Sequence, residues 1–216
     1  MNLHAIVLGA TGATGRELVK YLIKNPKLTK ISIFTRKEIG IDDEKLIKHI
    51  IDFSCLENYK NIIKGDILFS ALGTTLKDAG SKEKQFLVDY TYQYEFAKIA
   101  AQNGVSNYSL VSAQGANSSS RFFYPKIKGE LEESIKKLNF IRSHIFQPSF
   151  LIRQKDLIRN GEKVAISIFL FLNKFGLFKS MQPITVAFLA RRMIDEALNK
   201  REEKIITYNL NDILSL

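Results

Sequence analysis

The feature that most constrains the fold is a run of glycines and small residues near the start of the chain, Gly9-Ala10-Thr11-Gly12-Ala13-Thr14-Gly15. It follows an apolar segment, Ile6 to Leu8, that is typical of a buried strand, and it precedes apolar residues at helical spacing. A strand that passes through glycines into a helix forms a cradle for a diphosphate, because the backbone can approach the anion and the helix N-terminus presents free N–H groups. The run predicts dinucleotide binding; a plain glycine turn is the structural alternative.

Each glycine of the run has an expected role. Gly9 makes the turn, Gly12 admits the ligand, and Gly15 lets the helix pack closely on the strand. The cofactor contacts predicted from the run are Gly9, Thr11, Gly12, Ala13, Thr14 and Gly15.

Length and composition are those of one globular domain. The chain has 216 residues, of which 45% are hydrophobic and 25% charged, so it can bury a sizeable core but leaves no room for a second large domain. We expect one domain over residues 1–216. Cys55 is the only cysteine, which excludes an internal disulfide, and no charged-then-apolar leader opens the chain. Both observations predict a cytoplasmic location.

The longest apolar stretch, Val164 to Leu172, has about half the length that a membrane-spanning helix needs, so no transmembrane segment is expected. We interpret this stretch as a core or pocket helix. Lys174 and Lys179 follow it and leave open the alternative of a helix that lies on an acidic lipid surface.

The charge of the chain is compatible with several partners. A formal net charge of +10 suits nucleic acid, membrane surfaces or phosphorylated ligands, but the lysines are scattered and no aromatic-basic RNA-binding motif is present. We therefore expect a solvated basic surface and no nucleic-acid partner. His4, His49 and His144 are isolated, which predicts no metal site.

Strand-like and helix-like segments alternate over the first two-thirds of the chain. This alternation predicts an α/β fold, a doubly wound Rossmann-type parallel sheet with helices on both faces. The expected strands are 3–8, 30–34, 47–51, 66–70, 107–112 and 141–147, and the expected helices are 13–24, 57–63, 83–103 and 122–138. A further helix to about residue 199 and a last edge strand over 204–208 follow.

The expected strand ends carry candidate cofactor contacts. Arg36 and Lys37 follow the second strand, where the adenosine ribose should lie, and their charge suits the 2′-phosphate of NADP rather than NAD. Two solvated basic residues are the alternative. After the third strand, Asp52 can hold the adenine amino group while Phe53 covers the ring, although Asp52 is equally suited to a turn.

The fourth strand runs into small residues that permit close backbone approach to a ligand. They are Ala71, Leu72 and Gly73, followed by Thr74 and Thr75.

A candidate reactive group follows the fifth strand. Ser112 ends that strand, and Tyr124 and Lys128 lie four apart, on one face of a helix. A phenol has a pKa near 10, and a nearby ammonium would lower that pKa towards the working range. Ser112 would bind the substrate oxygen, Tyr124 would handle the proton during hydride transfer, and Lys128 would also hold the nicotinamide ribose.

Four motifs occur in the order and at the separations typical of one family: Gly9-x-x-Gly12-x-x-Gly15-Arg16, Leu72-Gly73-Thr74-Thr75, Val111-Ser112 and Tyr124-x-x-x-Lys128-Gly129-Glu130. Together they resemble the atypical branch of the short-chain dehydrogenase/reductases, and within it the Tat-interactive protein 2-like oxidoreductase group. The resemblance covers roughly residues 3–155, and the remainder more loosely. It implies a Rossmann fold, NADP(H), Ser112 and Tyr124 as catalytic residues and Lys128 as their partner.

Two positions depart from this pattern. Gln147-Pro148-Ser149 resembles a Pro-Gly turn near the nicotinamide in extended members, which implies a cofactor contact at Pro148, but Ser149 replaces the glycine. Pro125 lacks an N–H and fits only the first turn of a helix, so the helix starts near Phe123 or is kinked there. A kink would separate Tyr124 from Lys128 and leave a cofactor-binding site without fast turnover.

The last third of the chain, about residues 150–216, is expected to contribute a small substrate lobe. Its aromatic residues favour a hydrophobic carbonyl substrate, and a plain core explains them equally: Phe169, Phe171, Phe175 and Phe178. Three carboxylates on the preceding helix are expected to form its solvated face: Glu130, Glu132 and Glu133.

The sequence thus predicts an NADP(H)-dependent oxidoreductase that acts on an unidentified small carbonyl or alcohol, with Ser112, Tyr124 and Lys128 as the catalytic group. A catalytically quiet NADP(H)-sensing regulator with a protein partner is the first alternative. An epimerase or dehydratase with the same tyrosine is the second, and it would need a larger sugar-nucleotide lobe. The sequence leaves an oligomer open.

Overall fold

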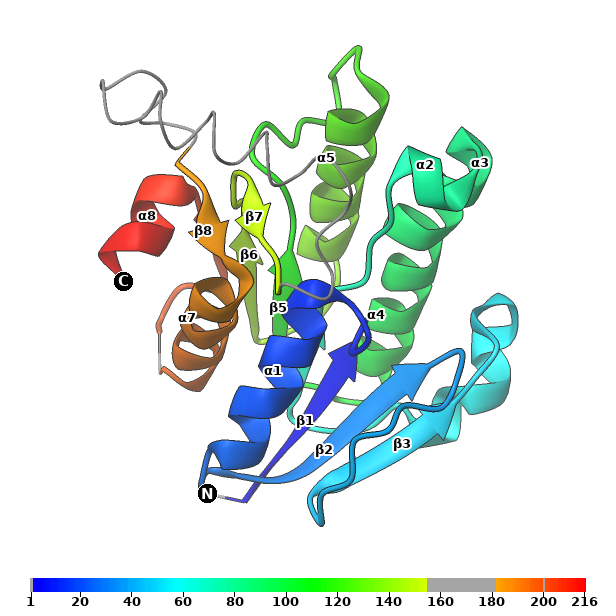
Figure 1. Ribbon diagram of the computed structural model, residues 1–216, viewed down its shortest axis with the longest axis vertical. Helices are drawn as coiled ribbons and strands as arrows, with labels where there is room; N and C mark the ends of the chain where they lie inside the picture. The colour runs from blue at the N-terminus through cyan, green and yellow to red at the C-terminus, as the bar shows by residue number, and fades with distance from the viewer. Residues whose placement is uncertain (1, 155–181, 200) are drawn as a thin grey trace.

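The computed structural model describes residues 2–154, 182–199 and 201–216 (Figure 1). Their main feature is a seven-stranded parallel sheet in the order β3-β2-β1-β4-β5-β6-β9. Its strands are β1 Leu3–Leu8, β2 Leu28–Thr35, β3 Leu46–Ile50, β4 Ile67–Ser70, β5 Asn107–Val111, β6 Arg142–Phe146 and β9 Ile205–Tyr208. The strand order reverses between β1 and β4, which places a ligand crevice at the carboxyl ends of these two strands.

Helices cover both faces of this sheet. They are α1 Ala13–Lys24, α2 Leu76–Ala79, α3 Lys82–Phe86, α4 Tyr92–Gln102, α5 Phe123–Lys136, α7 Val186–Leu198 and α8 Leu210–Ser215. A 3₁₀ helix, Phe53–Ile62, follows β3, and a π-helical turn, Leu87–Thr91, joins α3 to α4. The predicted doubly wound Rossmann-type fold is confirmed.

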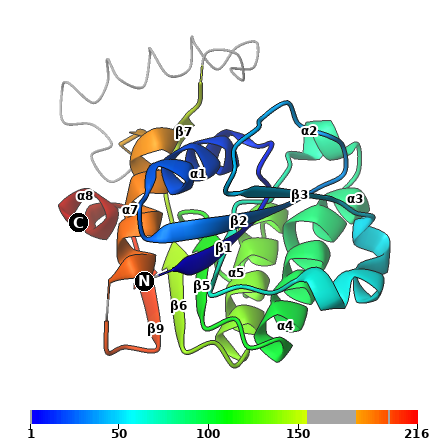
Figure 2. The same ribbon diagram turned by 90° about the horizontal axis from the view of Figure 1, so that it is seen from below.

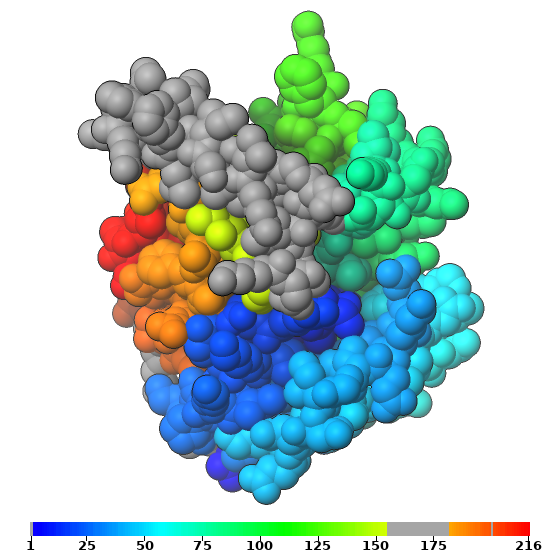
Figure 3. Space-filling view, viewed as in Figure 1, coloured from blue at the N-terminus to red at the C-terminus, as the bar shows by residue number. Residues whose placement is uncertain are grey.

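The sheet separates two hydrophobic cores. On one face α1 and α7 pack against the strands through residues such as Leu18, Leu22 and Met193. On the other face α4 and α5 pack through residues such as Phe96 and Leu131. Figure 2 shows the sheet between these two layers, and Figure 3 shows α7 (orange) beside α1 (blue) on the surface. Successive side chains of β1 point into the two cores in turn. Because both cores are apolar, the sequence of β1 is a nearly continuous apolar run.

The structure differs from the expected elements in a few places. The expected helix 83–103 contains the π-helical turn Leu87–Thr91, and the expected helix 57–63 is part of a longer 3₁₀ helix. The expected edge strand 204–208 is β9, beside β6. α8 and a two-stranded sheet, β7 Leu151–Ile152 with β8 Ile184–Thr185, were not expected.

The expected C-terminal lobe is described only in part. The apolar stretch Val164–Leu172 and the four aromatic residues expected to line the lobe lie outside the described residues. In the described part, α7 and β9 join the main domain rather than a separate lobe. Over residues 2–154, 182–199 and 201–216, the structure has no helix with the length and apolar character needed to span a bilayer.

Two glycines fix the turn between β1 and α1. Gly9 has φ +87°, and a Cβ there would lie 2.6 Å from the Ala71 carbonyl carbon and the Leu72 nitrogen. A Cβ on Gly15 would overlap the Gly9 carbonyl oxygen and lie 2.9 Å from the Ala10 Cα. Both neighbours are backbone and cannot rotate away, so these positions accept only glycine without a shift of the chain.

We expect Gly15→Ala to lower the free energy of unfolding by about 1–3 kcal/mol, because the added methyl group must displace backbone in a packed region. Gly40→Ala is the control, since a Cβ there meets nothing within 4 Å. Urea unfolding of both variants measures the difference. Equal midpoints for the two variants would contradict this account of the turn.

Candidate cofactor and active site

Two adjoining cavities lie at the carboxyl ends of the central strands. The larger has a volume of about 770 Å³ and the smaller about 340 Å³. The residues that line both lie at the switch point between β1 and β4: Gly12, Ala71, Leu72, Gly73 and Thr74. A dinucleotide needs such a shape, with one compartment on each side of a phosphate cradle.

The glycine cradle lies where the sequence predicts it. Gly12 caps the start of α1 with no side chain over the first turn, and its N–H donates to the Gly9 carbonyl at 2.9 Å. Ala13 and Thr14 line the larger cavity, and Thr11 the smaller. The open N-terminus of this 12-residue helix presents N–H groups and the positive end of the helix dipole to both cavities.

The residues expected near the adenosine are not all brought together. Arg36 and Phe53 line the smaller cavity with Gly9. Lys37 is exposed and absent from the lining, and its backbone carbonyl accepts from Thr35 Oγ1 at 2.7 Å.

Asp52 has the turn role that the sequence left as an alternative. Its carboxylate accepts from the backbone N–H of Ser54 at 2.8 Å and from the Ser54 hydroxyl at 2.7 Å. These two hydrogen bonds hold the pKa of Asp52 below its usual value. The carboxylate therefore caps the 3₁₀ helix, while Phe53 faces the cavity.

Ser112, Tyr124 and Lys128 all line the larger cavity. Ser112 follows β5 and is tied to β6 by its N–H, which donates to the Phe146 carbonyl at 2.8 Å. α5 begins at Phe123, so Pro125 lies in the first turn, where its missing N–H breaks no helical hydrogen bond. The helix is not displaced, and Tyr124 and Lys128 stay one turn apart on the cavity side.

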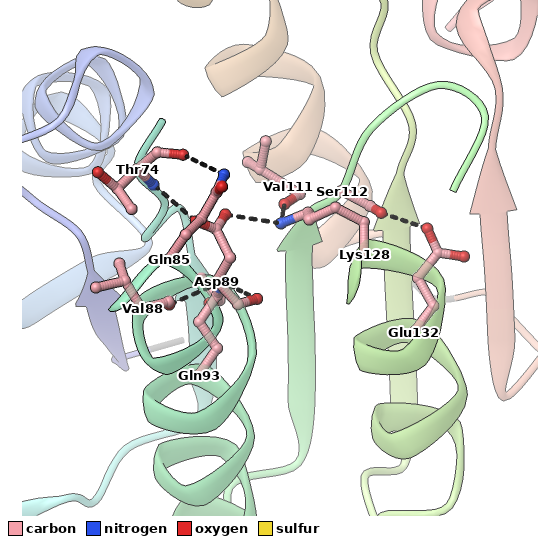
Figure 4. Close-up of polar contacts among 10 residues, drawn as sticks. Thr74, Gln85, Val88, Asp89, Gln93, Val111, Ser112, Lys128 and Glu132 are labelled. Atoms are coloured by element: carbon pink, nitrogen blue, oxygen red, sulfur yellow. Dashed lines mark hydrogen bonds and ion pairs between the residues drawn. The ribbon is translucent and has the colours of Figure 1, made fainter. Parts of the chain in front are cut away.

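Lys128 is a buried cation. Its side chain is 2% exposed, and its Nζ donates to the Val111 carbonyl at 3.2 Å and lies 4.0 Å from Asp89 Oδ1 (Figure 4). Burial lowers the pKa of Lys128, while the carboxylates of Asp89 and Glu132 oppose that shift. The ammonium therefore depends on these two acidic partners.

Asp89 is a site residue that sequence analysis missed. It lies in the π-helical turn, and its carboxylate accepts from the Thr74 N–H at 3.0 Å while it faces Lys128. Burial raises the pKa of Asp89, and Lys128 opposes that shift. Gln85 supports the same loop by donating to the Thr74 carbonyl at 3.3 Å. No local sequence pattern predicts a π-helical turn, so nothing in the sequence indicated that Asp89 pairs with Lys128.

The pKa of Tyr124 differs from the expectation. The side chain is 42% exposed, yet burial around the phenol, followed by repulsion from Asp89, raises its pKa to about 12, with Arg153 opposing. The expected lowering by Lys128 is wrong for this structure, because that ammonium faces Val111 and Asp89. Tyr124 therefore keeps its proton at neutral pH, and its hydroxyl is able to donate a hydrogen bond.

Glu132 corrects a second expectation. It is 4% exposed rather than solvated, and its carboxylate accepts from the Ser112 hydroxyl and from Gln147 Nε2, the latter at 3.0 Å to each oxygen. Tyr124, Lys128 and Glu132 are spaced four apart, so all three lie on the same face of α5. That spacing was a signal that sequence reasoning could have used.

Pro148 and Ser149 also line the larger cavity. The Pro148 carbonyl accepts from the Gln114 N–H at 2.9 Å, which joins the segments after β5 and β6. The Ser149 hydroxyl donates to the Gln182 carbonyl at 2.5 Å.

Comparison with known proteins relates these features to other chains. Residues 4–104 match a family model described as semialdehyde dehydrogenase, NAD binding domain. Rat Protein HTATIP2 is 31% identical over 172 residues, which cover 78% of this chain and 71% of the rat protein. Protein FMP52 of Candida albicans is 32% identical over 224 residues, which cover 99% of this chain and 98% of that protein.

Solved structures share the fold at low sequence identity. The Bordetella bronchiseptica enzyme WbmG in complex with NAD has a TM-score of 0.72 at 12% identity, with 97% of this chain and 73% of that chain covered. UDP-glucose 4-epimerase from Thermotoga maritima has a TM-score of 0.69 at 13% identity, with 95% and 76% covered. At this identity the likeness establishes the fold alone.

The expectation of a cytoplasmic location is wrong by this comparison. The FMP52 proteins of Candida albicans and Scheffersomyces stipitis are named as mitochondrial. A single Cys55 is compatible with any reducing environment, so it does not identify a compartment.

We expect Asp89→Asn to lower the free energy of unfolding by about 3 kcal/mol, because it leaves the buried Lys128 without its nearest carboxylate. The amide oxygen can still accept from Thr74, so the variant isolates the charge. Guanidinium unfolding at pH 7 measures the loss, with Asp195→Asn on the exposed side of α7 as the control. A loss no larger than that of the control would contradict the pairing.

Proposed function

This chain belongs to the family of the HTATIP2 and FMP52 proteins, and we propose that it is an NADP(H)-dependent oxidoreductase that interconverts a small carbonyl compound and its alcohol. One observation carries the proposal: Ser112, Tyr124 and Lys128 line the same cavity as Gly12 at the open N-terminus of α1. The proton-handling groups and the phosphate cradle therefore face one shared space.

The residues present fit a dinucleotide. A Cβ at Gly9 would meet backbone at 2.6 Å, and Gly12 leaves the first turn of α1 without a side-chain cap, so the cradle is open to an anion. The nicotinamide of the bound cofactor would supply or accept the hydride. In this proposal Gly73 admits the cofactor and Pro148 borders the nicotinamide, both as parts of the larger cavity wall.

The chain's own residues supply the proton chemistry. Tyr124 carries its proton at neutral pH, so it can donate to a substrate oxygen when a carbonyl is reduced and regain the proton from an alcohol in the reverse direction. Ser112 accepts a hydrogen bond from the same oxygen in its alcohol form, and Lys128 holds the cofactor ribose. Asp89 and the Val111 carbonyl hold the Lys128 ammonium in place beside this cavity.

The preference for NADP(H) over NAD(H) rests on Arg36. Its side chain lines the smaller cavity beside Gly9 and Thr11, where a 2′-phosphate would lie, and a guanidinium can bind a phosphate through two hydrogen bonds. Lys37 is exposed at the rim and would add charge without contact in this arrangement.

A regulator that binds NADP(H) and turns over slowly is the second candidate. The raised pKa of Tyr124 favours it, because a phenol with a pKa of about 12 is a poor proton acceptor at neutral pH. Removal of the Tyr124 hydroxyl separates the two candidates.

We expect Tyr124→Phe to reduce carbonyl turnover by about 10²–10⁴-fold, because it removes the proton donor. The Kd for NADPH should stay at the wild-type value. The assay is NADPH oxidation with a panel of aromatic and aliphatic ketones and aldehydes, and Tyr94→Phe on α4, outside both cavity linings, is the control. Turnover equal to that of the control, or no turnover in the wild type despite NADPH binding, would favour the regulator.

We expect Arg36→Asp to weaken NADPH binding by at least about tenfold and to leave NADH binding unchanged or tighter, because it replaces a phosphate-binding guanidinium with a carboxylate. Fluorescence titration with each cofactor measures the two Kd values. Lys136→Asp changes the net charge equally on the exposed end of α5 and should leave the ratio unaltered. An unchanged ratio in Arg36→Asp would refute the assigned role.

A further inference from the structure

The hydroxyl of Ser112 has a single proton, and that proton is directed to Glu132. Ser112 Oγ donates to Glu132 Oε1 (Figure 4). Gln147 Nε2 donates to both oxygens of the same carboxylate at 3.0 Å. Ser112 and Glu132 are each 4% exposed, so water does not compete for these contacts. A carboxylate can only accept hydrogen bonds, so Ser112 must be the donor in this pair.

This arrangement decides what Ser112 offers to a ligand. Ser112 lines the larger cavity, and because its hydroxyl proton is donated to Glu132 in a hydrogen bond, only the lone pairs of its oxygen are left for a ligand there. Tyr124 lines the same cavity and keeps its own proton, because burial raises its pKa to about 12. Of these two hydroxyl groups in the cavity lining, Ser112 is therefore the acceptor and Tyr124 the donor.

A hydroxyl group and a carbonyl group meet this pair differently. An alcohol oxygen can donate its proton to Ser112 and accept from Tyr124 at the same time. A carbonyl oxygen can accept from Tyr124 but has no proton for Ser112, so two sets of lone pairs would face each other. An unmatched buried polar group reduces affinity.

We propose that Glu132 is a positioning residue that fixes Ser112 as a hydrogen-bond acceptor, so that the cavity selects the alcohol form of the substrate over the carbonyl form. This inference rests on the proposed function, because it concerns the substrate of that reaction. The preference for the alcohol over the carbonyl rests on the contacts among Ser112, Glu132 and Gln147. It gives a role to a carboxylate whose position on the helix predicted only a solvated face.

Cyclohexanol and cyclohexanone test the proposal, because they share a ring and differ at the oxygen. Both are titrated into the cofactor-free protein at pH 7 and followed by the side-chain amide signals of Gln147 in ¹⁵N NMR. The wild type should bind cyclohexanol about 3- to 10-fold more tightly than cyclohexanone. In Glu132→Gln the new amide can donate to Ser112 and turn its proton towards the cavity, so the preference should disappear.

Glu133→Gln is the matched control. Glu133 is the next residue of α5, is exposed, and accepts from the hydroxyl of Ser118 outside the cavity lining, so its loss should leave the preference intact. Ser112→Ala is a second variant that does not disturb the carboxylate. It removes the acceptor and should also abolish the preference.

Equal affinity of the wild type for the two probes, including a lack of binding to both, would overturn the proposal. A preference retained in Glu132→Gln or in Ser112→Ala would overturn it as well. NADPH binding is measured separately on the same preparations. Failure to bind NADPH would contradict the proposed function but would not change the affinities measured for the two probes. Failure of the proposed function and failure of the alcohol preference are therefore distinguishable.

Discussion

A buried positive charge holds the candidate site together. The ammonium of Lys128 is shielded from solvent, and an unpaired charge in such a place costs several kcal/mol. Its partners come from separate elements: the Val111 carbonyl ends β5, Asp89 lies in the π-helical turn, and Glu132 is one turn further along α5. The charge therefore requires that these elements meet at one point.

The two carboxylates beside Lys128, Asp89 and Glu132, also hold other parts of the crevice. Asp89 holds the backbone N–H of Thr74, and Thr74 lies in the loop that lines both cavities. Glu132 holds Ser112 in the lining of the larger cavity. The two carboxylates that stabilise Lys128 thus also fix the loop after β4 and the serine after β5, so electrostatics and site geometry are linked through one residue.

Local spacing was sufficient to predict the fold and the glycine turn between β1 and α1. α1 runs from Ala13 to Lys24 as expected, because the glycines before it and the apolar period within it are both local features. The doubly wound parallel sheet followed from the alternation of strands and helices and from the handedness of their connections. Prediction was weakest where tertiary contacts determine the structure. Contacts with elements distant in sequence determine three features: the place of Asp89 in the π-helical turn, the burial of Glu132, and the direction of the Lys128 ammonium. A four-residue spacing shows that Tyr124 and Lys128 share a face, but it does not show that the ammonium binds the Val111 carbonyl and faces Asp89.

Every role proposed for these residues depends on the binding of NADP(H) in this crevice. The most direct test is a titration of the purified wild-type protein with NADPH and with NADH, followed by energy transfer from its tyrosines to the reduced nicotinamide; the chain has eight tyrosines and no tryptophan. The account predicts saturable binding of NADPH, at least about tenfold tighter than that of NADH because of the charge-assisted contact with Arg36. The absence of saturable binding of either cofactor would contradict it.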